Sequence, residues 1–127
     1  MAILGIGVDV AHIPRFTAML KRRGPDKLAQ RILSDLELAH WHASHRRDHA
    51  LKDEQYLAVR WALKEAAYKA VYPTFRPTWK DITYHSLGEL ETASKPCLSY
   101  KSHPNLTLHC SVSHDGDYVF ATVIAEK

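Results

Sequence analysis

The sequence predicts an α+β domain in which an antiparallel sheet packs on one long helix, with short helices near the N-terminus. Helical periodicity with start and stop signals dominates the first half. From Trp79 onward, apolar and polar residues alternate as they do in half-buried strands. Asp115-Gly116 is a strong signal for a tight hairpin between the last two alternating segments. A chain of 127 residues suits one domain spanning 1–127.

The first element is a predicted strand over 3–10 that is rich in β-branched residues. Gly5 and Gly7 interrupt it, which would let another part of the chain approach its backbone closely. These glycines do not indicate a dinucleotide-binding loop, because the third glycine is absent and no helix-opening glycine-rich loop follows. Asp9 stands at the end of this strand.

Three short helices are predicted next. Pro14 suits the first turn of a helix that Gly24-Pro25 ends, and a second helix follows over 26–33. Ser34 and Glu37 form a capping-box pattern, so a third helix begins there. The basic, polar segment HASHRRDH after it is predicted to be a loop.

The long helix begins near Asp53, and the prolines of 73–77 end it. At about 100° per residue, one side collects the residues expected to face the core, namely Tyr56, Val59, Leu63, Ala66, Ala67 and Ala70. Glu65 falls on the other side. There its neighbours are Ala58, Trp61, Ala62, Tyr68 and Tyr72, with Lys69 as the only other charge. A carboxylate is therefore predicted on an apolar part of the helix surface.

Four strand candidates share the period-two pattern of the second half: KDITYHSL, PCLSY, LTLHCSVS and YVFATVIAE. Short polar segments join them, and there is no internal repeat. Helices in the first half and strands mostly in the second favour an antiparallel sheet.

Composition excludes several classes of protein. Hydrophobic residues make up 46% and charged residues 24%, as in an ordinary globular domain. The formal charge of +3, with nine histidines besides, suits an anionic partner. Two cysteines cannot build a secreted disulfide framework, and no apolar segment is long enough to span a bilayer. No signal peptide is evident, so we expect an intracellular protein.

Asp9 and Glu65 are the residues that first suggest chemistry. A carboxylate among apolar groups is costly unless something positive joins it, and Mg²⁺ is often held by one or two protein carboxylates while phosphates and waters complete its shell. Lys69, one turn after Glu65, could neutralise a phosphate oxygen on the same face. From periodicity alone, an ordinary Glu/Lys pair on a helix surface is the stronger alternative.

Five blocks, in order, resemble the small holo-acyl-carrier-protein synthases, the AcpS-type 4′-phosphopantetheinyl transferases: GIGVDVAHIPRF, QRILSDLEL, RWALKEAAYKAV, KPCL and SVSHDGDYVFATVI. The match covers nearly the whole chain. It implies transfer of the phosphopantetheine arm of coenzyme A to a serine of apo acyl carrier protein. The products would be holo carrier protein and adenosine 3′,5′-bisphosphate, which implies a place in fatty acid biosynthesis.

The resemblance also implies roles for particular residues. Asp9 and Glu65 would ligate Mg²⁺, and Lys69 would offset charge on the pyrophosphate or protonate the leaving group. The base for the serine proton stays open between Glu65 and a metal-bound water. The residues matched to positions that contact coenzyme A are Arg60, Lys64, Ser113 and His114. For the first two, a solvated surface position is an equal alternative.

The first helical region is basic, with Arg15, Lys21, Arg22, Arg23, Lys27 and Arg31. Because carrier proteins present an acidic helix beside their serine, Arg15, Arg22 and Arg23 are the predicted docking residues. The resemblance further implies a homotrimer with a site at each subunit junction. A neighbouring subunit would then cover the apolar surface near Trp61.

Some features depart from the family or leave rivals open. His12 stands where many members have an acidic residue, and VYPTFRP replaces the usual glycine-containing segment after the long helix. The histidines of 40–49 are better explained by a polar loop than by zinc. The rival functions are a binding module of the same fold without transfer, and a small basic nucleic-acid-binding protein.

Overall fold

The computed structural model describes residues 2–44, 53–85 and 96–127. Its helices and strands, in chain order, are β1 (Ile3–His12), α1 (Ile13–Arg23), α2 (Pro25–Ile32), α3 (Asp35–Ser44), α4 (Asp53–Val71), β2 (Ile82–His85), β3 (Cys97–Tyr100), β4 (Thr107–Asp115) and β5 (Tyr118–Glu126). The predicted α+β class is confirmed. α3 includes the first residues of the predicted loop HASHRRDH, and 45–52 lie outside the described residues.

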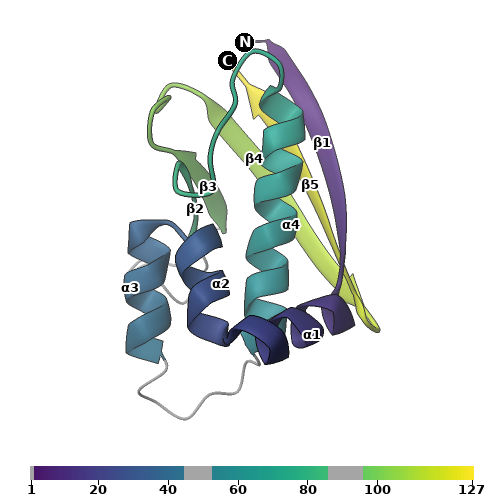
Figure 1. Cartoon of the computed structure of the whole chain (residues 1–127). Coiled ribbons are helices and arrows are strands. Elements are labelled where there is room, and N and C mark those ends of the chain that lie inside the picture. The colour runs from purple at the N-terminus through teal and green to yellow at the C-terminus, as the bar shows by residue number, and fades with distance from the viewer. Residues whose placement is uncertain (1, 45–52, 86–95) are drawn as a thin grey trace.

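The strands form one antiparallel five-stranded sheet in the order β1-β5-β4-β3-β2. The long helix α4 lies across one face of this sheet, and the short helices gather around its N-terminal half (Figure 1). β1 and β5 pair over most of their lengths, and α4 packs chiefly against these two strands. The core therefore lies between α4 and the inner face of the sheet.

Gly5 and Gly7 let α4 approach β1 more closely than any side chain would allow. A Cβ atom built on Gly7 would stand 1.8 Å from the Ala66 carbonyl oxygen, and one on Gly5 would stand 2.2 Å from that of Ala70. Because both contacts are with backbone, neither could be relieved by a rotamer change. The prediction of a close approach at these glycines is confirmed. The next inward-facing residue on β1 after Gly7 is Asp9, because side chains alternate along a strand.

α4 is buried on more sides than its periodicity predicts. Ala58 and Ala62, expected to surround Glu65 at the surface, are fully buried, whereas Tyr56 and Val59 on the predicted core side are only partly buried. The reason is that α1 and α2 also pack on α4, so a second apolar face is needed. The predicted apolar surface around Glu65 is therefore wrong for these alanines.

Trp61 is likewise packed within its own chain. Its ring lies 5.5 Å from Phe16 and 4.8 Å from Trp79, centroid to centroid. The more exposed aromatic residues here are Tyr68 on α4 and Tyr72 directly after it, whose rings stack 5.6 Å apart. These contacts leave Trp61 partly buried, and its predicted contact with a neighbouring subunit stays a prediction.

Candidate active site

β1 and α4 bring Asp9, Glu65 and Lys69 to one place, which we call the β1–α4 site. Lys69 Nζ donates hydrogen bonds to the Val8 carbonyl oxygen at 2.9 Å and to Asp9 Oδ1 at 3.3 Å. Glu65 lies one turn before Lys69 on α4, close enough for its charge to interact with both. Residues that are more than 50 positions apart in the sequence are joined here because the two glycines draw β1 against the helix.

Both carboxylates of this site are harder to ionise than they would be in water, because the pKa of each is raised. Burial raises the pKa of Asp9, against the opposing effect of the Lys69 hydrogen bond and charge. Burial also raises the pKa of Glu65, and the nearby charge of Asp9 raises it further, while Lys69 acts in the opposite direction. Since burial is the largest cause of both shifts, a cation bound beside the two carboxylates would stabilise their charged forms.

The donor set fits a hard divalent cation. Asp9 and Glu65 supply two carboxylates from separate elements, the number that Mg²⁺ uses when phosphates and waters complete its octahedron. Within 2–44, 53–85 and 96–127 no group of three His, Cys, Asp or Glu side chains could hold a metal alone. These two residues could therefore hold Mg²⁺ only together with a ligand that brings oxygens of its own.

Arg15, predicted as a docking residue, also lies near this site. Its charge acts to lower the pKa of both Asp9 and Glu65. Its guanidinium carbon is 5.4 Å from the centre of the Trp61 ring, a cation–π distance. Sequence reasoning missed this position because the turn from β1 into α1 determines it. Arg22 and Arg23 are exposed in the last turn of α1.

Arg60 and Lys64 are buried. They are therefore not solvated surface residues, and their charged groups are not accessible to a phosphate from solvent. They are 5% and 3% exposed, and both face Glu37. Lys64 Nζ donates to Glu37 Oε1 at 2.5 Å and to the carbonyl oxygens of Ile32 and Trp79 at 2.7 and 2.9 Å. All three ammonium protons are thereby used inside the protein, which does not support the predicted contact of Lys64 with coenzyme A.

Glu37 is a structural residue that the sequence revealed only in part. The capping box is confirmed: Ser34 N–H donates to Glu37 Oε1 at 2.8 Å, and Glu37 N–H donates to Ser34 Oγ at 3.3 Å. The other carboxylate oxygen of Glu37, Oε2, accepts a hydrogen bond from the Tyr84 N–H at 3.1 Å. No local pattern relates Glu37 to Lys64, so only the fold joins them.

Ser113 and His114 lie on β4, which β5 separates from β1 in the sheet. The register pairs Ser113 with Phe120 and His114 with Val119. Since Val119 is buried and Phe120 exposed, Ser113 belongs to the outer face of the sheet, opposite to α4. The structure therefore does not bring Ser113 together with Asp9 and Glu65 within one chain.

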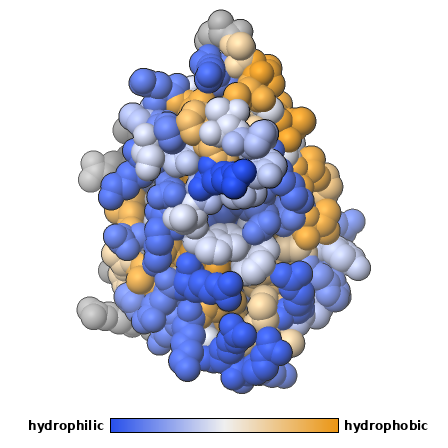
Figure 2. All heavy atoms as spheres, turned by 45° about the horizontal axis from the view of Figure 1, so that its top comes forward, coloured by the Kyte–Doolittle hydropathy of each residue, from blue (hydrophilic) through white to orange (hydrophobic). Residues whose placement is uncertain are grey.

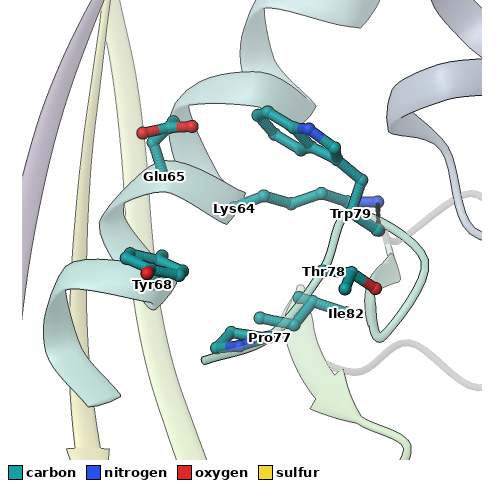
Figure 3. Close-up of a pocket in the computed structure, with 7 residues that line it drawn as sticks. All are labelled: Lys64, Glu65, Tyr68, Pro77, Thr78, Trp79 and Ile82. Carbon is teal, nitrogen blue, oxygen red and sulfur yellow. Dashed lines mark hydrogen bonds between the residues drawn. The ribbon is translucent and has the colours of Figure 1, made fainter. Parts of the chain in front are cut away.

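A cavity of about 210 Å³ opens beside Glu65, between α4 and the segment 77–82 (Figure 3). Its lining residues are Lys64, Glu65, Tyr68, Pro77, Thr78, Trp79 and Ile82. The segment 77–82 was not identified as part of a site from the sequence, where the prolines indicated only the end of the helix.

Residues 5–123 match the family model of the 4′-phosphopantetheinyl transferase superfamily. The chain belongs to this superfamily. Holo-[acyl-carrier-protein] synthase of Vibrio cholerae is 37% identical over 98% of both chains. The crystal structure of the Neisseria meningitidis holo-[acyl-carrier-protein] synthase (AcpS) superposes with a TM-score of 0.78 and 30% identity, over 99% of this chain and 100% of that one.

A third similar protein is the holo-(acyl-carrier-protein) synthase from Bacillus anthracis, solved in complex with CoA (3′,5′-ADP). It has a TM-score of 0.72 and 27% identity over 97% of this chain and 96% of that one. The predicted family, fold and enzyme class of this phosphopantetheinyl transferase are thus confirmed. In the described part of the chain, no helix has the length and apolar character needed to cross a membrane.

Proposed function

We propose that this phosphopantetheinyl transferase moves the 4′-phosphopantetheine arm of coenzyme A onto a serine hydroxyl of apo acyl carrier protein, with Mg²⁺ as cofactor. The observation that carries the proposal is the β1–α4 site, where two half-buried carboxylates with raised pKa values stand beside a lysine. In the reaction, the serine oxygen bonds to the phosphorus next to the pantetheine arm. The bond from that phosphorus to the other phosphate breaks, and adenosine 3′,5′-bisphosphate leaves.

The residues of the site have distinct tasks in this reaction. Asp9 and Glu65 would hold the Mg²⁺, which when bound offsets negative charge on the pyrophosphate. Lys69 is the most exposed member, with 53% of its side chain accessible. Its ammonium can therefore exchange its hydrogen bonds to Val8 and Asp9 for phosphate oxygens, and it can donate a proton to the leaving phosphate. Glu65 is one candidate acceptor for the serine proton.

We infer that the chain self-associates, as the homotrimer that the family resemblance implies, because one sheet face is apolar and exposed. This outer face comprises Ile6, Val8, Val10, Phe120, Thr122, Ile124 and Ser113. Val10 and Phe120 are 53% and 45% exposed. Hydrophobic residues gather along the right-hand side of Figure 2, the side on which β1 lies in Figure 1. Association through this face would bury it. Ser113 and His114 of one chain could then reach the coenzyme A bound by the next.

The apo carrier protein would dock on the basic surface of α1. Arg15 belongs to the first turn and lies nearest the β1–α4 site, while Arg22 and Arg23 extend the positive surface. An acidic carrier helix lying along α1 would thus bring its serine toward Asp9 and Glu65. We expect this partner inside the cell, in cytoplasm or mitochondrion.

The decisive experiment incubates the protein with apo carrier protein, coenzyme A and Mg²⁺ and weighs the carrier by mass spectrometry. A mass gain equal to one phosphopantetheine group supports transfer, and its absence with several acyl carrier proteins contradicts it. Glu65→Ala should abolish the gain while circular dichroism stays native, and the matched control Asp35→Asn, at an exposed acidic position on α3, should leave it intact.

Two rival functions give different results in the same samples. A binding module of this fold would hold coenzyme A or the carrier without any mass gain. A nucleic-acid-binding protein would be retained on DNA in a salt-dependent manner and would not bind coenzyme A. The carboxylates at Asp9 and Glu65 favour a bound cation over a nucleic-acid surface.

A further inference from the structure

The guanidinium of Arg15 lies over aromatic rings at the start of α1. Its Cζ atom is 5.4 Å from the centre of the Trp61 ring and 5.7 Å from that of Phe16. Both are cation–π distances, and indole is the strongest ring partner for a cation. Within the described residues, no hydrogen bond or ion pair holds the Arg15 side chain. This exposed arginine is therefore supported by ring contacts alone.

The Trp61 ring is itself held in place by other rings. The Phe16 ring meets it nearly at right angles, with centroids 5.5 Å apart, and the Trp79 ring lies 4.8 Å away. Trp61 belongs to the long helix α4, on which α1 packs. The ring is thus fixed before any ligand arrives, so it can serve as a rigid support for a flexible side chain on α1.

A stacked arginine is better prepared to bind a carboxylate than a free one. Ordering a long side chain at an interface opposes association, and a side chain that is already ordered avoids most of this cost. Stacking uses the flat face of the guanidinium, whereas a carboxylate binds at its N–H edge, so the two contacts are compatible. A lysine ammonium has no flat face and cannot be held in this way.

Arg15 also lies within electrostatic reach of the reacting site, because its charge acts to lower the pKa of Asp9 and of Glu65. The direction in which its guanidinium points therefore determines where a bound acidic group lies relative to these carboxylates. Arg22 and Arg23 differ from it, since neither has a cation–π contact within the described part of the chain.

We propose that Trp61 is a positioning residue for the carrier protein, an inference that rests on the proposed function of Arg15 in docking. The indole holds the Arg15 guanidinium flat and presents its N–H edge to a carboxylate of the carrier. The carrier is thereby bound in one register beside the β1–α4 site. Arg22 and Arg23, without such support, contribute charge but do not fix this register.

Two substitutions separate stacking from charge. Arg15→Lys keeps the charge at an exposed position and should fold, whereas Trp61→Leu removes the ring. Each should raise the KM for the carrier about fivefold, while kcat and the KM for coenzyme A change less than about twofold. Trp61→Phe keeps a ring and should stay within about twofold of the wild type. Arg22→Lys is the matched control and should change the KM less than about twofold.

The double variant Arg15→Lys/Trp61→Leu tests whether the two residues act through one contact. Its KM should stay at about the fivefold increase of either single variant, because the second substitution has no contact left to remove. An increase of about 25-fold, the product of the two single effects, would show independent roles and overturn the proposal. Equal effects of Arg15→Lys and Arg22→Lys would overturn it as well, even if Trp61→Leu did not fold.

NMR spectroscopy gives a readout that does not depend on turnover. The ring current of Trp61 should displace the Arg15 side-chain proton signals upfield in the wild-type protein, and Trp61→Leu should remove the displacement while the β-sheet signals stay native. Undisplaced Arg15 signals in the wild type contradict the stacking. If the wild-type protein modifies no acyl carrier protein, the proposed function itself fails. If it does and Arg15→Lys behaves like the wild type, only the role of Trp61 is refuted.

Discussion

Two lysines five residues apart on α4 each pair with a carboxylate, and the two pairs have opposite characters. Lys64 lies 2.5 Å from Glu37, and the two side chains are 2% and 1% exposed. Lys69 lies 3.3 Å from Asp9, with exposures of 53% and 17%. The buried pair has its donors satisfied by neighbouring backbone, whereas the exposed pair leaves Lys69 accessible to a ligand.

The comparison shows that the position of a lysine around α4 determines whether it is buried with its partner or accessible from solvent. Lys64 faces the junction of α2, α3 and the segment after α4, where an unpaired ammonium would be costly. Lys69 faces the edge strand β1, where its side chain is exposed to solvent. The first pair therefore holds the fold together, and the second is available for chemistry.

Breaking the buried pair should produce the largest effect. Lys64→Met leaves the Glu37 carboxylate buried without its closest cation, so the free energy of unfolding should fall by about 3–5 kcal/mol, measured by urea denaturation. The double variant Glu37→Gln/Lys64→Met should recover part of the loss, because the second substitution removes the buried negative charge that Lys64→Met leaves without its closest cation. A loss below about 1 kcal/mol would place this pair with ordinary surface pairs.

Breaking the exposed pair should leave stability almost unchanged and remove activity. Lys69→Met should lower kcat/KM for carrier modification by about 10²–10³. The free energy of unfolding should change by less than about 1 kcal/mol, because the pair is exposed to solvent. A matched control is Lys101→Met, at an exposed lysine after β3. Loss of stability comparable with that of Lys64→Met would contradict the contrast.

Magnesium should also distinguish the two pairs, through a smaller effect that appears as a change in Tm. Millimolar MgCl₂ should raise Tm by roughly 3 °C in the wild-type protein, because a cation bound at Asp9 and Glu65 stabilises only the folded state. Asp9→Asn should lose this shift, whereas Glu37→Gln should keep it, since Glu37 lies in the buried pair. A shift of the same size in Asp9→Asn would exclude Asp9 as a ligand.

The smallest effect is expected at the charges that belong to neither pair. Arg22→Ala/Arg23→Ala should raise the KM for the carrier about two- to fivefold, with kcat unchanged, because these exposed residues act on the encounter rate. Added salt should shrink the difference between the variant and the wild type. A change confined to kcat would place these residues closer to the chemistry than α1 allows.

Much of the fold was predictable because its signals are local. The capping box at Ser34, the prolines after α4 and the Asp115-Gly116 hairpin each act through neighbouring residues. Asp9, Glu65 and Lys69 were identified from family blocks, and the paired glycines of β1 indicated a close approach. The errors concern α4, where Ala58, Ala62 and Lys64 are buried because a second layer of helices covers them.

The sequence by itself therefore determined the elements, the family and the three residues of the β1–α4 site. The tertiary structure alone decided which lysine is buried with Glu37, where Arg15 lies and that segment 77–82 forms a cavity wall. The physical reason is distance along the chain. Hydrophobic periodicity indicates only which side of a single helix is apolar. The partner of a charged side chain depends on how elements tens of residues apart pack together.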